Sequence, residues 1–366
     1  MPAFIPGLQL SRLFYEEAVK PILDARFPVL RYSAALLGSG SEVLGYDTPI
    51  STDHHWGPRI WLFLPDDSDG DDERRAAIAR TLSDELPYQV RGYSTNFGQP
   101  AENGVQLPEE ISAGPVNHWV RPTTVRLFVA GLLGVDPFRA ISAAEWLTFP
   151  EQHLLELTAG AVYHDGLDEL ERVRRAFAYY PRDVWLYRLA AQWKRISQEE
   201  AFVGRCGDAG DDLGSRIVAA RLVRDLMRLC FLLERRYAPY SKWLGTAFGR
   251  LDCAGELGPV FTRILAADNW REREEHLSRA YETVAGLHNA LAITPPLDGR
   301  VSAYHDRPYR VIHADRFAAA TRAAITDEAI KQIPADIGGV DQFVDSTDVT
   351  DRPELCRRLG ALFAWC

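Results

Sequence analysis

The sequence LLGSGSEVLGYDTPISTDHHWGPRIWLFL, at residues 36–64, contains the features that decide the fold. It begins within an apolar run, residues 29–38, that ends in glycine, as expected of a strand buried on both faces. A turn rich in glycine and serine follows, and residues 59–64 form a second apolar run. Glycines in such a turn let backbone N–H groups approach a polyphosphate, and a serine hydroxyl adds a donor. The stretch therefore predicts an anion cradle between two buried strands.

The residues around this stretch predict an α/β domain. The spacing of apolar residues predicts a first helix over residues 11–27, kinked at Pro21. Further helices are expected at residues 71–86 and 123–133, and further strands at residues 88–93 and 115–120. We expect this first domain to span residues 1–138.

The remainder of the chain predicts an all-α part. From about residue 141 the pattern changes to long amphipathic helices, which indicates a helical-bundle domain over residues 139–330. Residues 309–314 form either a short edge strand or a loop. Residues 331–366 are expected to be an appended tail. The predicted fold class is thus α/β plus all-α.

Composition and charge exclude several classes of protein. The 366 residues are 46% apolar and 25% charged, which is typical of globular domains. The net charge of −10, without a basic tract, argues against binding to a nucleic-acid backbone. The five cysteines form no CxxC pair, the N-terminus lacks a signal-peptide pattern, and no apolar stretch approaches the roughly 20 residues of a membrane span. We expect a cytoplasmic protein with no nucleic-acid or membrane partner.

Residues 40–53 resemble the signature of the nucleotidyltransferase superfamily of DNA polymerase β type, especially its minimal bacterial members and the aminoglycoside nucleotidyltransferases. Those proteins have an apolar strand, Gly-Ser, about ten residues, and then Asp-x-Asp on the next strand. Gly40 and Ser41 match the first part and Asp53 the second, with eleven residues between Ser41 and Asp53. The positions where the minimal members have Gly, Pro and Ser are filled here by Gly45, Pro49 and Ser51.

The resemblance implies a mixed sheet with flanking helices, and it implies that Asp53 holds Mg²⁺, or Mn²⁺, bound to ATP or another nucleoside triphosphate. The second acid of the motif is replaced by His55, which contributes no negative charge as a neutral imidazole. His55 is therefore assigned as a metal ligand or as the base that accepts the proton of the acceptor hydroxyl. The family's third carboxylate is missing from residues 115–120, where His118 is either a half-buried strand residue or a catalytic one.

The whole chain also resembles an uncharacterised bacterial family of predicted nucleotidyltransferases. The phrases that carry this resemblance are GSEVLGYD, DHHWGPR and RRYAPYSKWL, and it extends from about residue 30 to about residue 330. This family has no assigned reaction, so the resemblance implies a fold more than a function.

A second candidate segment is the helix and turn at residues 215–244. Arg221, Arg224 and Arg228 recur at i, i+3 and i+7 and form a basic stripe. The stripe either pairs with acids such as Asp225 or residues 198–200 across a domain interface, or it receives phosphate. The resemblance to small-molecule nucleotidyltransferases implies two further contacts, the triphosphate with Lys242 and the base or ribose with Tyr240.

Three charged residues near the turn have two interpretations each. Arg59 either meets a phosphate or pairs with Asp53. Glu42 and Asp47 either replace the missing metal ligand or are solvated or bonded within the turn.

The predicted function is metal-dependent transfer of a nucleoside monophosphate, most simply AMP from ATP, to a hydroxyl of a small molecule. Gly40 and Ser41 would cradle the β and γ phosphates, and Lys242 would neutralise the leaving pyrophosphate. The alternative is a catalytically degenerate nucleotide-binding protein that acts as a sensor or scaffold. Binding needs only the glycine-serine turn, whereas chemistry needs the charges of the metal site.

Overall fold

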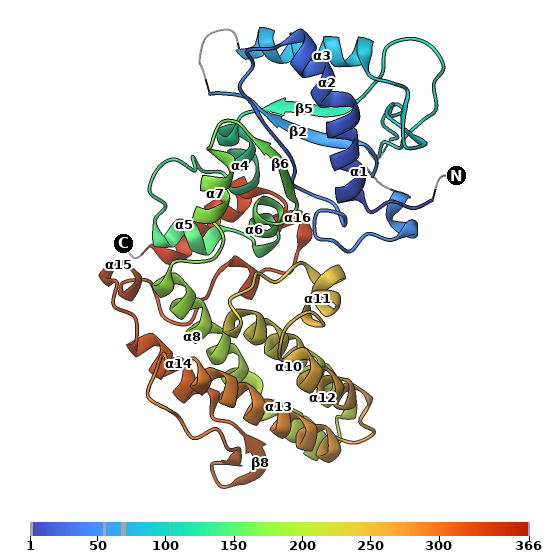
Figure 1. Ribbon diagram of the computed structural model, residues 1–366. Helices are drawn as coiled ribbons and strands as arrows, with labels where there is room; N and C mark the ends of the chain where they lie inside the picture. Colours follow the sequence, from blue (N-terminus) through green and yellow to red (C-terminus); the bar gives the residue numbers. More distant parts are fainter. Residues whose placement is uncertain (1–2, 54–55, 67–70, 103, 365–366) are drawn as a thin grey trace. The chain divides into compact units, whose positions relative to one another are not determined.

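The computed structural model describes residues 3–53, 56–66, 71–102 and 104–364. The chain folds into two compact units (Figure 1). Unit 1 comprises Met1–Ala140 and His153–Ala178, and unit 2 comprises Ile141–Gln152 and Tyr179–Cys366. The first limit lies close to the predicted boundary at residue 138, but a later segment returns to unit 1. Within the described ranges, no helix is long and apolar enough to cross a membrane.

Unit 1 is built on a mixed four-stranded sheet with the strand order β5-β2-β1-β6. The strands are β1 (Ser33–Leu36), β2 (Arg59–Phe63), β5 (Trp119–Thr123) and β6 (Ala161–Asp165). Strand β1 pairs antiparallel with β2 and β6, whereas β2 pairs parallel with β5. The predicted α/β class of this part is confirmed, and both apolar runs that flank the glycine-serine turn are strands.

Strand β6 corrects the prediction, which placed its residues in the helical-bundle domain. Helix α6 (Glu151–Thr158) ends two residues before Gly160, whose φ of +71° is a left-handed conformation that terminates a helix. The Gly160 N–H donates to Val43 O, which turns the chain back onto the sheet. This strand explains why a segment beyond residue 152 belongs to unit 1.

The expected strand at residues 88–93 is also wrong, because these residues form a separate hairpin. Strands β3 (Gln89–Val90) and β4 (Tyr93–Ser94) pair with each other and not with the main sheet. Arg91 and Gly92 both have positive φ, as the two central residues of a tight hairpin turn do.

Helices cover both faces of the sheet (Figure 1). One face packs Ile60, Leu62 and Leu64 into a core with α1 (Gly7–Phe14), η1 (Tyr15–Val19), α2 (Lys20–Arg26) and α3 (Asp71–Glu85). On the other face, Phe128 of α4 (Val125–Leu133) packs edge-on against Trp61 and Phe63. The alternation along β2 therefore leaves Arg59 and Trp61 on the side away from the N-terminal helices.

The predicted irregularity at Pro21 is a π-helical turn. Residues Tyr15–Val19 form this turn between α1 and α2, one turn before the proline. Proline has no N–H to donate to the carbonyl four residues earlier, so the regular hydrogen-bond ladder is interrupted there. The turn accommodates that loss without ending the helical path.

Unit 2 is mainly helical, as predicted. Its long helices are α8 (Arg182–Glu199), α10 (Asp212–Leu233), α12 (Ala254–Ala266), α13 (Trp270–Ala290) and α14 (Ala314–Ala323). The shorter ones are α5 (Ala143–Thr148), α9 (Phe202–Asp208), α11 (Ser241–Phe248), α15 (Glu328–Lys331), α16 (Thr347–Thr350), α17 (Pro353–Arg358), η3 (Val340–Gln342) and η4 (Leu359–Phe363). Strands β7 (Ser302–Tyr304) and β8 (Arg307–Val311) form a hairpin, so most of residues 309–314 is not a loop. In unit 1, α7 (Leu170–Ala176) and η2 (Pro49–Asp53) complete the elements.

The C-terminal residues differ from the appended tail that the sequence predicts. Val340 is fully buried, and the Gln342 amide donates to Arg188 O and to Gln192 Oε1. These polar and apolar contacts integrate the segment into unit 2, because a tail without them would remain solvated.

A buried carboxylate joins α8 to the start of α14. Glu200, which follows α8, accepts hydrogen bonds from the N–H groups of Ile312 and Ala314. These amides flank His313, whose φ of +53° turns them toward one acceptor. Burial raises the pKa of Glu200 from 4.5 to about 7 despite these bonds.

We expect the stability of the protein to fall as the pH rises from about 4.5 to about 7, in part because of Glu200. Over that range the folded state retains a proton that the unfolded state has released, so rising pH favours unfolding. The Glu200→Gln variant should lose part of this pH dependence, measured by urea unfolding at pH 5 and pH 7.5. Glu275→Gln, at an exposed site on α13, is the control and should keep it. An unchanged pH dependence in Glu200→Gln would contradict the assignment.

Candidate functional site

The glycine-serine turn lies at the end of the sheet where strand β1 ends and strand β2 begins. Because the two strands are antiparallel, the chain that leaves β1 emerges beside the start of β2. The Trp61 indole N–H donates to Leu37 O at 3.1 Å, which holds the exit of β1 against β2. Residues 38–41 and the segment that precedes Arg59 therefore lie at the same end of the sheet.

A buried ion pair supports the turn from beneath. Arg59, the first residue of β2, donates from Nε to Glu42 Oε1 at 2.9 Å, and the two side chains are only 9% and 4% exposed. A second nitrogen, Nη2, donates to the carbonyl oxygen of Ser39. The described partner of Arg59 is thus Glu42, which was not expected from the sequence, and the Glu42 carboxylate is bonded to Arg59 instead of being solvated.

The turn presents backbone donors that no described residue accepts. The N–H groups of Ser39, Gly40 and Ser41 make no hydrogen bond within the described part of the chain. Gly40 has a φ of +137°, and a Cβ there would lie 2.4 Å from Arg59 Nη2 and 2.6 Å from Glu42 Oε2. Only glycine lets the backbone lie so close to the ion pair, and three adjacent free donors are suited to bind an anion.

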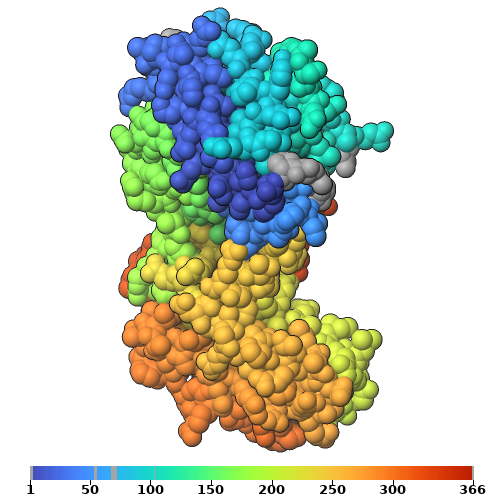
Figure 2. Space-filling model, turned by 45° about the vertical axis from the view of Figure 1, so that its right-hand side comes forward, coloured from blue at the N-terminus to red at the C-terminus, as the bar shows by residue number. Residues whose placement is uncertain are grey.

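Asp47 has a structural role in the same loop. Its Oδ2 accepts the Gly7 N–H at 2.7 Å and the Trp56 indole N–H at 3.2 Å. Trp56 also stacks on Phe4, so the N-terminal segment and this loop lie side by side at the surface, in dark and lighter blue in Figure 2. Of the two interpretations of Asp47, the structure therefore favours hydrogen bonding within the loop over a role as metal ligand.

The remaining motif residues lie in η2 and in the segment that follows it. Ser51 Oγ accepts the Thr48 N–H at 3.0 Å and closes the turn that contains Pro49. Asp53 ends η2, but its side chain lies outside the described part of the structure, and His55 lies outside it entirely. Their predicted roles as metal ligands remain predictions.

Strand β5 carries an arginine and no carboxylate. Arg121 pairs in register with Trp61 and stacks over Trp119, with its guanidinium carbon 4.3 Å from the ring centroid. His118 lies just before β5, half-buried, and is a structural residue. Its Nδ1 accepts the Val120 N–H, and its Nε2 therefore donates to Ala79 O.

No group of three histidine, cysteine, aspartate or glutamate residues that could hold a metal ion exists among the described residues. Glu42, which could have supplied a ligand, uses its carboxylate for Arg59. The described residues therefore provide adjacent backbone donors at the turn but no group of ligands for a metal.

Tyr240 and Lys242 lie in unit 2, whereas the glycine-serine turn lies in unit 1. The Tyr240 N–H donates to Gln152 Oε1, and the exposed Lys242 ammonium lies 5.1 Å from the ring centroid of Trp243. The predicted contacts of Lys242 with the triphosphate and of Tyr240 with the nucleobase or ribose stay predictions.

The described partners of the arginine stripe of α10 are carboxylates and a backbone carbonyl of unit 2. Arg221 lies 2.8 Å from Glu199, as the sequence allowed, and Arg224 pairs with Asp345. Arg228 donates to the carbonyl of Asp341. Asp225, the other expected partner, instead faces Arg195 of α8 at 3.4 Å.

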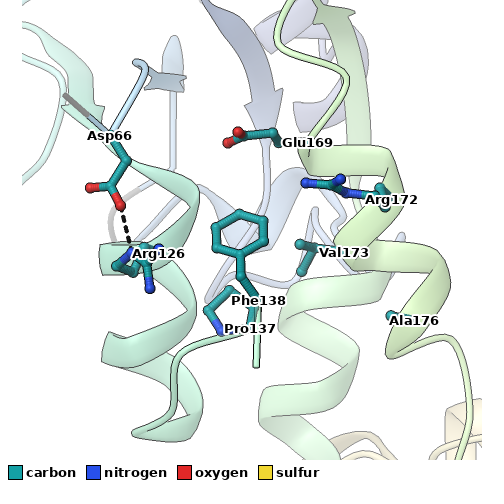
Figure 3. Close-up of a pocket in the computed structure, with 8 residues that line it drawn as sticks. All are labelled: Asp66, Arg126, Pro137, Phe138, Glu169, Arg172, Val173 and Ala176. Atoms are coloured by element: carbon teal, nitrogen blue, oxygen red, sulfur yellow. Dashed lines mark hydrogen bonds and ion pairs between the residues drawn. The ribbon is translucent and has the colours of Figure 1, made fainter. Parts of the chain in front are cut away.

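Unit 1 has a pocket of about 590 Å³ (Figure 3). It lies at the other end of the sheet from the glycine-serine turn. It is formed after the ends of β2 and β5, where Arg126 of α4 pairs with Asp66. Phe138 lies between the guanidinium groups of Arg126 and Arg172, at 5.2 and 5.6 Å from its ring centroid. This pocket contains none of the predicted site residues, so the candidate site is the turn and not the pocket.

Comparisons with known proteins leave the function open. Residues 146–244 match the model of a domain of unknown function, DUF4037, which covers well under half of the chain. A solved structure, a nucleotidyltransferase-like protein from Exiguobacterium sibiricum, aligns over 81% of this chain and 82% of its own with 9% identity and a TM-score of 0.30. No curated protein matches the sequence.

Gly40→Ala should destabilise unit 1 and deform the turn, because its Cβ would meet the buried ion pair and the backbone would be strained. Gly114→Ala is the matched control: its φ of +87° imposes similar strain, but nothing lies within 4 Å of the new Cβ. We expect Gly40→Ala to cost roughly 1–3 kcal/mol more than Gly114→Ala in urea unfolding. Equal losses would contradict the close approach at Gly40.

Proposed function

We propose that the protein binds a nucleoside triphosphate at the glycine-serine turn and transfers its nucleoside monophosphate, most simply AMP from ATP, to a hydroxyl of a small molecule. The observation that carries this proposal is the set of N–H groups at residues 39–41 that donate to no described residue. They lie at the end of β1, beside the start of β2, where the resemblance to nucleotidyltransferases predicts the phosphates.

The chain's own residues would have separate roles in this reaction. The amides of Gly40 and Ser41 would hold the β and γ phosphates, and the Arg59–Glu42 pair would keep the turn in place. Asp53 and His55 would hold Mg²⁺ or Mn²⁺, which supplies positive charge to the phosphates. His55 is alternatively the general base that accepts the proton of the acceptor hydroxyl. Lys242 would contact the leaving pyrophosphate, and Tyr240 would contact the nucleobase or ribose.

A second candidate function is nucleotide binding without catalysis, in which the protein acts as a sensor or scaffold. Arg121 on β5 favours it, since the third carboxylate of the superfamily is expected on such a strand and an arginine repels a cation. An arginine that reached the phosphates would neutralise them directly and so replace the metal for binding. The two candidates share the phosphate cradle and differ only in turnover.

Calorimetry with ATP and Mg²⁺, followed by pyrophosphate release over a panel of nucleotides and hydroxyl acceptors, tests both candidates. We expect wild type to bind ATP and to release pyrophosphate only when metal is present. The Asp53→Asn variant should no longer release pyrophosphate. Asp84→Asn, at an exposed site on α3, removes one carboxylate elsewhere and should behave as wild type.

The outcomes separate the two functions. Binding of ATP without pyrophosphate release in any combination would leave the sensor or scaffold. Absence of ATP binding would overturn both, and equal release by wild type and Asp53→Asn would remove the metal-site assignment.

A further inference from the structure

The arginine stripe of α10, which the proposed function does not use, is covered by a C-terminal segment of the chain. We call residues 334–345 the strap and Arg188, Arg224 and Arg228 the arginine face. The Tyr187 hydroxyl donates to Pro334 O, and Arg228 donates to Asp341 O. The strap therefore lies across α8 and α10 within unit 2.

The strap meets the arginine face with carboxylates. Asp345 accepts hydrogen bonds from both terminal nitrogens of Arg224, with 3.0 Å between Nη1 and Oδ2. An arginine offers the same bidentate geometry to phosphate. Arg224 holds the pKa of Asp345 below its usual range, so this carboxylate is charged at neutral pH. Asp341 Oδ2 lies 3.8 Å from Arg188. The strap thus places acidic oxygens where an oxyanion would bind.

Arg188 is an incompletely satisfied donor beneath the strap. Its side chain is fully buried and lies 3.1 Å from Glu151, but none of its three nitrogens makes a hydrogen bond in the described part of the chain. The Tyr179 hydroxyl is also buried without a partner there. Such groups cost stability when they are unpaired, so they favour a ligand rich in acceptor oxygens.

The backbone of the strap is what covers Arg188. A Cβ at Gly339 would lie 1.9 Å from Arg188 Nη1, so the chain passes directly over the guanidinium. Displacement of the strap would therefore uncover Arg188 together with Arg224 and Arg228.

The charge balance changes when the strap leaves. Five arginines in this cluster face five carboxylates, and two of these carboxylates, Asp341 and Asp345, belong to the strap. Without the strap, an excess of two positive charges remains.

We propose that the arginine face is a binding site for an oligophosphate group, and that the strap occupies it as an acidic competitor. An oligophosphate brings several charges and many acceptor oxygens, so it can replace both carboxylates and satisfy the donors of Arg188. This proposal does not depend on nucleotidyl transfer, because the site lies within unit 2 and needs neither the glycine-serine turn nor a metal.

Calorimetry with inorganic tripolyphosphate, without divalent metal, tests the site in the full-length protein. Asp345→Asn should bind about three- to tenfold more tightly than wild type, since it weakens the competitor. Arg224→Gln should bind at least tenfold more weakly than Asp345→Asn. Asp348→Asn removes one exposed carboxylate three residues away, outside any ion pair among the described residues, and should stay within twofold of wild type.

Hydrogen exchange locates the event. Tripolyphosphate should speed exchange at the amides of Gln342 and Val344, which donate to Gly339 O and Val340 O in the folded strap. Chloride at matched ionic strength should not. Equal affinities of wild type and Asp345→Asn, or unchanged exchange at saturating tripolyphosphate, would overturn the proposal. Tripolyphosphate binding that Arg224→Gln leaves intact would overturn it as well, because the anion would then bind elsewhere.

Discussion

The buried ion pair between Arg59 and Glu42 is the interaction on which the candidate site depends. Two charges removed from water are stable only when both are paired and further hydrogen bonds satisfy them. Here Arg59 also donates to Ser39 O, and the Ser11 hydroxyl donates to Arg59 O. One side chain and its backbone therefore connect α1, β2 and the turn. Loss of Glu42 alone would leave a buried guanidinium unpaired, at a cost of about 3–5 kcal/mol.

The same pair explains why the turn has free donors. Arg59 binds the Ser39 carbonyl from beneath, and Glu42 accepts from Arg59 instead of from the neighbouring amides. The N–H groups of residues 39–41 are consequently left without an acceptor within the described chain. A carboxylate that lay above the turn would have bound these amides and removed the cradle. Because Glu42 is buried and bonded to Arg59, its carboxylate does not take these donors.

The two central strands were predictable because their apolar runs leave no alternative, and β2 begins at Arg59 as expected. Strand β6 was not, since its pattern continues that of α6 and only the conformation of Gly160 separates the two elements. The pairing of Arg59 with Glu42 was not predicted, since the sequence suggested Asp53 or a phosphate and only the folding of the turn brings Glu42 to Arg59. The strap has no helical or strand periodicity in its apolar residues, so the sequence could not place it. Its contacts with Arg188 depend on how helices α8 and α10 pack.

Burial separates the two arginine–carboxylate clusters in function. Glu42 is 4% exposed, so an incoming anion cannot replace it without opening the core of unit 1. Asp345 is 68% exposed, and a solvated pair of this kind contributes about 1 kcal/mol or less to stability. A multivalent anion can therefore compete with the Asp345 carboxylate for Arg224, whereas the support of the turn is fixed. The Arg59–Glu42 pair therefore fixes the backbone of the turn, whereas the Arg224–Asp345 pair is open to exchange with a dissolved anion.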